Sequence, residues 1–506
     1  MNNNYPRYSF FFIFLFFIFL LKYSYISDFY YFSDQDYVHI YEALAFNNLL
    51  NQTYFDHPGF ICFFLLSLWF KILDIINLIS FSSLNEFKSK ADISNVNELV
   101  FYARILNLFV CYFIVLAFDK INNLFIKNKS ISFFVTIFFI ASASIYGLLI
   151  RIRTEEYSFL FFIVSLYFVF KIINNNKRIL FYLLICSFLS TIAMSAKIQI
   201  VMLIYFLPII FILMANLNEK FSEKDFNQSF PKYIYINFII LFLIGVAFLI
   251  TIFLNTLVVY PGNWFDSLPF YQFIFFSYIV FSLFVFTRIT NLNFIFFLKL
   301  NLFVFSGIFL GLIVIFIHPS SQLYNALIIF NPIDQMFFYS DKVDSNFSLI
   351  ERIFNYLLNI KSSSFTIAEL FLLILIIINN FIIWIHKKNI SISLLSILFL
   401  VAAYLIKIPL SFRGEVYSLP SHSHYLIFYI PMLFFSFLVT MRNTLVLEKY
   451  SLRLIKFGFI SLLIIFSLLS ININYKKIDR MVSTLDFCNH KGETKWDTFY
   501  YEYYCN

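Results

Sequence analysis

Charged residues are scarce in this chain. Asp, Glu, Lys and Arg together make up only 13% of its 506 residues, whereas hydrophobic residues make up 61%. A typical soluble domain carries about 25% charged residues. So few charges cannot cover the surface of a large water-exposed fold, and the composition therefore excludes a chain that is mainly soluble.

Several motifs of well-known chemistry are also absent. The five cysteines show no spacing typical of a metal site, and no glycine-rich phosphate loop or Ser-His-Asp triad spacing occurs. These absences argue against ATP and nucleotide-sugar chemistry. The net charge of +8 is scattered over short loops instead of forming one basic patch. We therefore expect no nucleic-acid partner.

Long apolar runs make up most of the chain. Residues 131–150, 234–254 and 365–385 match or approach the roughly 20 apolar residues that cross a bilayer core. The sequence predicts an all-α polytopic membrane protein with about thirteen transmembrane helices. The expected spans are 10–26, 99–118, 131–150, 157–173, 179–194, 198–215, 233–254, 268–286, 299–317, 365–385, 392–408, 425–440 and 454–471.

Lysine and arginine cluster in alternate short loops of this threading. The basic loops are 120–129, 171–178, 220–232, 387–388 and 442–453. Cytoplasmic loops carry an excess of such residues, so we expect these loops and the N-terminus on the cytoplasmic face. The run 10–26 has no small-residue cleavage site and is interpreted as a retained first helix, with a cleaved signal peptide as the alternative.

One apolar segment, residues 59–80, decides on which face the later loops lie. It contains Lys71 and Asp74. As a span, it would move every later basic loop to the outside. As an interfacial juxtamembrane helix, it leaves all of them inside, and the charge rule favours this interpretation.

Three long or chemically rich segments then fall on the external face: 27–98, 318–364 and 409–424. The tail 472–506 is also external and is too short to bury a core of its own. We expect a catalytic module over residues 1–215, further transmembrane helices over 216–471, and a bacterial inner (plasma) membrane location with the active site facing outward.

The first external loop carries the sharpest pattern in the chain. SDQDY (33–37) contains Asp34 and Asp36, YEAL (41–44) follows, and DHPG (56–59) stands before the juxtamembrane helix. A carboxylate partly shielded from water can have a raised pKa, which suits a general base acting on a hydroxyl. Taken singly, either aspartate could instead be an ordinary loop acid.

In this order the motifs resemble the GT-C superfamily of membrane glycosyltransferases, in particular its protein mannosyltransferase and aminoarabinose transferase branch. In that branch, an acidic pair in the first external loop precedes a His-Pro turn and an interfacial helix. Asp34 and Asp36 match the acidic pair, and His57 matches the turn. Because Gln35 separates the two acids, the resemblance leaves open which of them is the base.

The resemblance continues over the first two hundred residues. Arg104 matches the Ala-Arg that opens the next span of the family. The ridge RIRTEE (151–156) matches a second external acid preceded by a basic residue, with Glu where the family usually has Asp. It supplies Arg153, Glu155 and Glu156, which could alternatively form an interfacial anchor. Lys197 stands where the family places a lysine.

The second half of the chain offers less specific candidates. His318 opens one long external loop, and Arg413, His422 and His424 precede a span that contains a proline. These groups could bind the phosphate of a polyprenyl carrier, or could simply lie at the membrane interface.

The resemblance implies transfer of a sugar from a polyprenyl-phosphate donor to an acceptor hydroxyl on the non-cytoplasmic face, with inversion at the anomeric carbon. The implied catalytic residues are Asp34, Asp36, Glu155 and Glu156. Expected partners are the lipid-linked donor, a lipid, glycan or protein acceptor, and membrane lipids. A divalent metal stays open. A polysaccharide-unit polymerase and a lipid-intermediate flippase are the alternatives, although a flippase should carry midplane charges and internal repeats.

Overall fold

The computed structural model describes fourteen stretches of the chain: residues 5–24, 36, 38–52, 59–86, 93–149, 151–174, 178–197, 199–216, 232–259, 268–321, 366–385, 390–411, 426–444 and 459–472. Within these residues the regular structure is helical and no strand occurs. This agrees with the all-α class that the sequence predicts.

The helices follow one another along the chain with short connections. Their bounds are α1 (Tyr5–Tyr23), α2 (Val38–Asn47), α3 (Phe60–Ile75), α5 (Ile93–Phe125), α6 (Lys129–Ala141), α7 (Ala143–Tyr146), α8 (Thr154–Asn174), α9 (Ile179–Met194), α10 (Ile200–Asn216), α12 (Lys232–Val259), α13 (Leu268–Ile289), α14 (Phe294–Phe316), α18 (Ile367–Ile385), α19 (Ile390–Ser411) and α20 (Leu426–Thr444), with a further helix at Phe459–Asn472.

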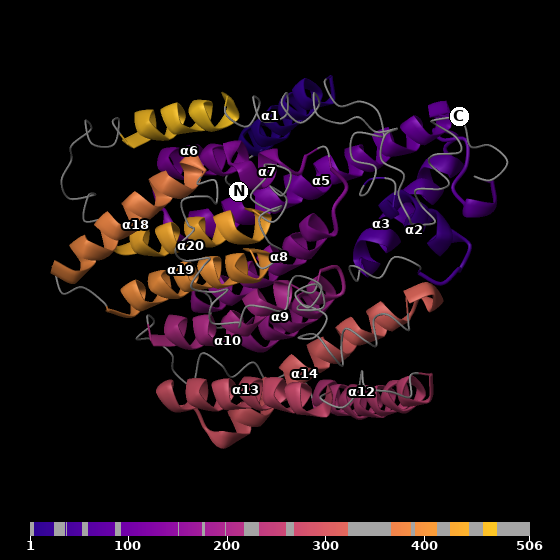
Figure 1. Ribbon diagram of the computed structural model, residues 1–506. Helices are drawn as coiled ribbons and strands as arrows, with labels where there is room; N and C mark the ends of the chain where they lie inside the picture. The colour runs from indigo at the N-terminus through magenta and orange to yellow at the C-terminus, as the bar shows by residue number, and fades with distance from the viewer. Residues whose placement is uncertain are drawn as a thin grey trace, which may run out of the picture.

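The helices form a bundle whose members run side by side. Figure 1 shows α8, α9, α10, α19 and α20 in its middle, with α1 and α6 along one side and α12, α13 and α14 along the other. The short helices α2 and α3 pack on each other at one end of the bundle. Stacked aromatic rings join distant segments in the interior, as where Phe118 of α5 lies 4.0 Å from Phe139 of α6.

Four of the described helices are long and apolar enough to cross a membrane by length and composition. They are Tyr5–Tyr23, Ser94–Phe125, Phe294–Phe316 and Ile367–Ile385. The outer surface is apolar as well: on α18, Phe381 is 58% exposed and Trp384 is 74% exposed. Large apolar side chains in contact with solvent are unfavourable in water but suit a lipid environment. These features are compatible with a membrane protein, and the threading with thirteen spans stays a prediction.

The predicted span 131–150 is not one continuous helix. Helix α6 ends at Ala141, Ser142 takes an extended conformation, and the short α7 follows. The Ser142 hydroxyl donates to the Phe139 carbonyl at 2.6 Å, which satisfies one of the free groups at the end of α6. The sequence suggested continuity because the whole run is apolar, but this local hydrogen bond ends the helix first.

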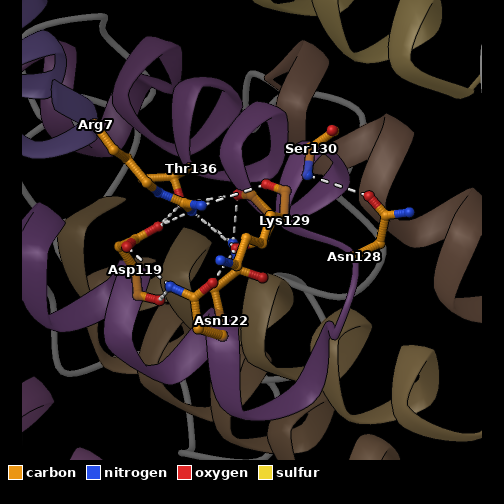
Figure 2. A network of polar contacts seen from close by, with 9 residues as sticks. Arg7, Asp119, Asn122, Asn128, Lys129, Ser130 and Thr136 are labelled. Carbon is orange, nitrogen blue, oxygen red and sulfur yellow. Dashed lines mark hydrogen bonds and ion pairs between the residues drawn. The ribbon is translucent and has the colours of Figure 1, made fainter. Parts of the chain in front are cut away.

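A polar network joins the first helix to the bundle (Figure 2). Arg7 of α1 forms an ion pair with Asp119 of α5 and donates to the Ser132 hydroxyl of α6 at 2.8 Å. Thr136 of α6 donates to the same Asp119 carboxylate at 2.9 Å. Since these groups are buried or half-buried, the network fixes the start of α1 against α5 and α6.

Helix α14 approaches α9 through two glycines. A Cβ atom on Gly307 would lie 2.3 Å from the Leu184 carbonyl oxygen, and one on Gly311 would lie 2.6 Å from Cβ of Thr191. Glycines four residues apart let two helix backbones come close together. This contact holds α14, and the His318 that follows it, against the middle of the bundle.

Candidate functional site

The centre of the site is a buried ion pair between the first external loop and α5. Asp36 and Arg104 are both fully buried, and the Asp36 Oδ2 atom lies 2.9 Å from Nη2 and 3.0 Å from Nε of Arg104. The backbone N–H of Ile152 donates to the other carboxylate oxygen at 2.8 Å. Burial raises the pKa of Asp36, against the opposing effect of Arg104 and of the Ile152 N–H.

The link between α7 and α8 is fixed from two sides. Asn107, one helical turn after Arg104 on α5, donates to the carbonyls of Leu148 and Arg151. Lys22 of α1 is buried, donates to the Tyr146 carbonyl and lies 4.0 Å from the centroid of the Tyr146 ring. These contacts hold the backbone in the position from which Ile152 reaches Asp36.

The start of α8 places two acids beside the ion pair. Glu155 and Glu156 lie in its first turn, where the helix dipole favours negative charge. Glu155 forms a fully buried ion pair with Lys197, with 2.8 Å between Oε1 and Nζ. Lys197 follows the end of α9, so this pair joins α8 to the α9 terminus.

Glu156 is also fully buried, and it carries a different environment from Glu155. Arg153 attracts its charge, whereas Glu155 and Asp36 repel it. Within the described part of the chain, neither carboxylate oxygen of Glu156 accepts a hydrogen bond of normal geometry, although the Asn107 amide favours its charged form. Such a buried group needs an explanation, and a bound polar ligand or water is the usual one.

The juxtamembrane helix is attached directly to the Lys197 region. The backbone N–H groups of Gly59 and Phe60 donate to the carbonyls of Ala196 and Ser195, at 3.0 and 3.1 Å. Gly59 has a φ of +65°, a conformation that glycine adopts without strain. The DHPG turn and Lys197 therefore meet through their backbones, as the external location predicted for both requires.

The buried charged cluster, as we define it, contains eight residues. Its cations are Lys22, Arg104, Arg151, Arg153 and Lys197, and its anions are Asp36, Glu155 and Glu156. Five positive and three negative charges leave a formal excess of two positive charges. Unbalanced charge is costly in a buried site, so the cluster favours an anionic ligand such as a phosphate.

The structure brings together five of the residues that the sequence singles out: Asp36, Arg104, Arg153, Glu155 and Glu156, with Lys197 paired to Glu155. Their side chains are at most 5% exposed, which is deeper than an interfacial anchor would lie. Arg104 does not open its helix, because α5 begins at Ile93. It lies inside the helix, facing Asp36.

His318 lies elsewhere at the site. Its ring stacks on Phe46 of α2 at 4.6 Å and meets Phe64 of α3 edge to face. Burial lowers the pKa of His318, and the positive charge of Lys71 lowers it further. His318 is therefore joined to the juxtamembrane helices rather than to the charged cluster. The other candidates, Asp34, His57, Arg413, His422 and His424, lie outside the described residues.

Sequence reasoning did not single out Lys22, Asn107 or Arg151 as site residues. Lys22 could have been found as an ionisable residue within an apolar helix, since such residues are often functional. Asn107 could have been found because it lies three residues after Arg104, on the same face of the helix. The role of the Ile152 N–H leaves no trace in the sequence, because every residue type except proline has this group.

Among the described residues, no group of three or more His, Cys, Asp or Glu side chains is arranged to hold a metal ion. Comparisons of the chain with known protein families, with curated proteins and with solved structures find no match. The resemblance to membrane glycosyltransferases therefore depends on the motifs of the first two hundred residues, and the function has to be argued from the site.

Proposed function

We propose that this protein is a membrane glycosyltransferase that moves a sugar from a polyprenyl-phosphate carrier to an acceptor hydroxyl. The acceptor is a lipid, a cell-envelope glycan or a protein. The observation that carries the proposal is the buried charged cluster, with its formal excess of positive charge at one end of an apolar bundle. A lipid-linked phosphate combines the two properties that such a place suits, an anionic group and a long apolar chain.

In the proposed reaction, the acceptor oxygen attacks the anomeric carbon and loses its proton to an aspartate, either Asp36 or Asp34. A new carbon–oxygen bond forms, the bond between the anomeric carbon and the phosphate oxygen breaks, and the polyprenyl phosphate leaves with the electron pair. A base with a raised pKa holds the proton more firmly, which suits Asp36 for this role. The resemblance implies inversion at the anomeric carbon.

The other residues of the cluster act on charge and orientation. Lys197 and the arginines stabilise the negative charge that develops on the leaving phosphate, an effect that is strong where water is excluded. Glu156 orients a hydroxyl of the sugar or acceptor, since its oxygens face other charged groups without a normal hydrogen bond in the described residues. Arg413, His422 and His424 are proposed to bind the phosphate as well.

We further propose that the site faces the non-cytoplasmic side of a bacterial inner membrane. This orientation is supported by the basic loops, which place the opposite end of the bundle in the cytoplasm. The position of α2 and α3 together at one end of the bundle also supports it, because a juxtamembrane pair is expected there.

A donor panel tests the reaction class. The purified protein is mixed with polyprenyl phosphates that carry different single sugars, together with membrane lipids and cell-envelope glycan as acceptors. The expected result is release of polyprenyl phosphate with matching transfer of the sugar from one donor class. Chain extension from a diphosphate-linked oligosaccharide without use of any monophosphate donor would instead support the polymerase.

Replacing both aspartates tests the proposed base. Asp34→Asn with Asp36→Asn removes the negative charge and keeps the shape, so turnover should fall roughly a hundredfold or more, since a positioned base contributes about 10²–10⁴. Asp74→Asn is a matched control, because this half-buried acid of α3 bonds Ser82 at 2.7 Å outside the cluster. A double variant that inserts normally and transfers sugar at the parental rate would remove the main support for the proposal.

A further inference from the structure

A groove of about 370 Å³ runs between α5, α8 and α9 on the outer side of the bundle. Phe113 and Ala117 contribute to its wall from α5, and Leu160 and Val164 from α8. Every lining residue is apolar except Lys120 and Tyr167. The groove is thus a hydrocarbon-lined channel with polar groups at particular positions only.

The groove has one apolar end and one basic end. From Phe113 to Lys120 it follows about 10 Å of α5, at 1.5 Å per residue. Tyr167 lies near Lys120, since the two groups interact electrostatically, and it is also the last groove residue along α8. The basic end is about 24 Å from Arg104 along the axis of α5, so it is separate from the buried charged cluster.

Two lysines stand at this basic end. The exposed Lys120 lies 5.0 Å from the centroid of the Tyr8 ring. Lys171, one turn after Tyr167 on α8, lies 5.4 Å from the Tyr167 ring and 5.3 Å from the Tyr182 ring. Aromatic contacts of this kind hold an ammonium group in place and leave part of it open to an anion.

The neighbouring acid is engaged by other partners. Asp119 precedes Lys120, but its carboxylate pairs with Arg7 and accepts hydrogen bonds from Thr136 and Asn123, both at 2.9 Å (Figure 2). Among the described residues, Lys120 forms no ion pair. The basic end of the groove therefore keeps a positive charge that a ligand can use.

We propose that this groove binds one anionic phospholipid of the membrane leaflet at that end of the bundle. An acyl chain lies between Phe113 and Val164, and the headgroup phosphate meets Lys120 and Lys171. Charge complementarity selects this occupant: the chain requires the apolar wall, and the net negative headgroup requires the two lysines. The inference goes beyond the glycosyltransferase proposal and does not depend on it.

Photo-crosslinking in nanodiscs tests the site. The full-length protein is placed in discs of phosphatidylcholine that contain a few per cent of a probe lipid with a diazirine in its acyl chain, either phosphatidylglycerol or phosphatidylcholine. Labelled peptides are then identified by mass spectrometry. Phosphatidylglycerol should label the α5 and α8 groove peptides at least fivefold more than the phosphatidylcholine probe, since each basic residue near a surface contributes about fivefold in binding.

Three variants separate charge from shape. Lys120→Gln with Lys171→Gln should abolish the preference for phosphatidylglycerol and leave labelling by phosphatidylcholine unchanged. Ala117→Phe fills the groove and should lower labelling by both probes. Lys299→Gln is the matched control, because Lys299 also lies over a tyrosine ring, that of Tyr235 at 5.1 Å, but lines no part of the groove.

Two results would overturn the proposal. One is equal labelling of the groove peptides by both probes, which would make the groove ordinary lipid-facing surface. The other is a preference for phosphatidylglycerol that survives in the double lysine variant. Neither result would affect the donor assay, so this inference and the proposed function fail independently.

Discussion

The pair between Asp36 and Arg104 concentrates the energetic risk of the site in two side chains. Both are fully buried, and removal of one partner from such a pair typically costs about 3–5 kcal/mol because the other is left as a buried lone charge. The pair joins the first external loop to α5. Loss of either group should therefore affect the position of the loop as well as its charge.

An Arg104→Gln variant tests how this pair sets the proton affinity of Asp36. Arg104 lowers the pKa of Asp36, which burial raises, so its removal should raise that pKa further. If deprotonated Asp36 is the base, the acidic limb of the pH profile of kcat/KM moves to higher pH. The measurement is sugar transfer by the purified variant over a range of pH.

Two controls make this result specific. Arg104→Lys keeps a positive charge and should return the limb towards its parental position. Arg288→Gln removes an exposed arginine of α13 that lies 5.0 Å from the Phe284 ring, and it should leave the profile unchanged. A limb that stays in place in the Arg104→Gln enzyme would show that Asp36 is not the titrating base.

At this scale the residue types of the site were predictable, but their pairing was not. Glu155, Lys197 and Arg104 stand out as charges next to apolar runs, where each needs a partner. The sequence does not show that Arg104 pairs with an aspartate 68 residues earlier. That contact depends on the long-range packing of the loop on α5.

Among the elements, the contact between α9 and α14 does the most to fix the geometry of the site. Helix α9 leads to Lys197, and α14 leads to His318. The glycines of α14 face Ser187 and Thr191 of α9. The motif GIFLG (307–311) has the glycine spacing that favours close helix packing in membranes, so this contact could have been predicted from the sequence.

Substitution of Gly307 by leucine should therefore destabilise the protein. A Cβ atom there would lie 2.0 Å from the Ser187 hydroxyl and 2.3 Å from a backbone carbonyl, so the two helices have to move apart. Overpacking of this kind costs about 1–3 kcal/mol. We expect a lower midpoint of thermal unfolding in detergent, measured by size-exclusion fluorescence, whereas Ile308→Leu on the adjacent position should have little effect. An unchanged midpoint for Gly307→Leu would contradict the close contact.

Element boundaries were less predictable than element type. The apolar pattern gave the helical class because no other structure satisfies backbone groups over such long apolar runs. It did not give the break at Ser142, because hydropathy is the same on both sides of it. Local hydrogen bonds set that boundary, and they depend on a single serine.

For the whole molecule, the open question is which end of the bundle faces the cytoplasm. Helix α3 bears on it because it covers Phe60–Ile75, which is about 24 Å at 1.5 Å per residue and shorter than a bilayer core of about 30 Å. It also contains Lys71 and Asp74, and it packs against α2 at one end of the bundle. These properties favour the interfacial position that the sequence predicts for it.

Cysteine labelling tests this topology directly. The described native cysteines, Cys62, Cys111 and Cys186, are buried, so they should react slowly, and Cys488 and Cys505 of the tail are first replaced by serine. A cysteine at the exposed Asn85 should then react with a membrane-impermeant maleimide added outside intact cells. A cysteine at residue 346 should react in the same way, whereas one at residue 175, in a basic loop, should react only after the membrane is opened. If α3 crosses the membrane instead, Asn85 and residue 175 lie on opposite sides from those stated, relative to one another, and position 85 labels together with position 175. That pattern would separate the first external loop from the RIRTEE ridge, although Asp36 and Ile152 are in contact at 2.8 Å, so we expect labelling at 85 and 346 from outside and at 175 from inside.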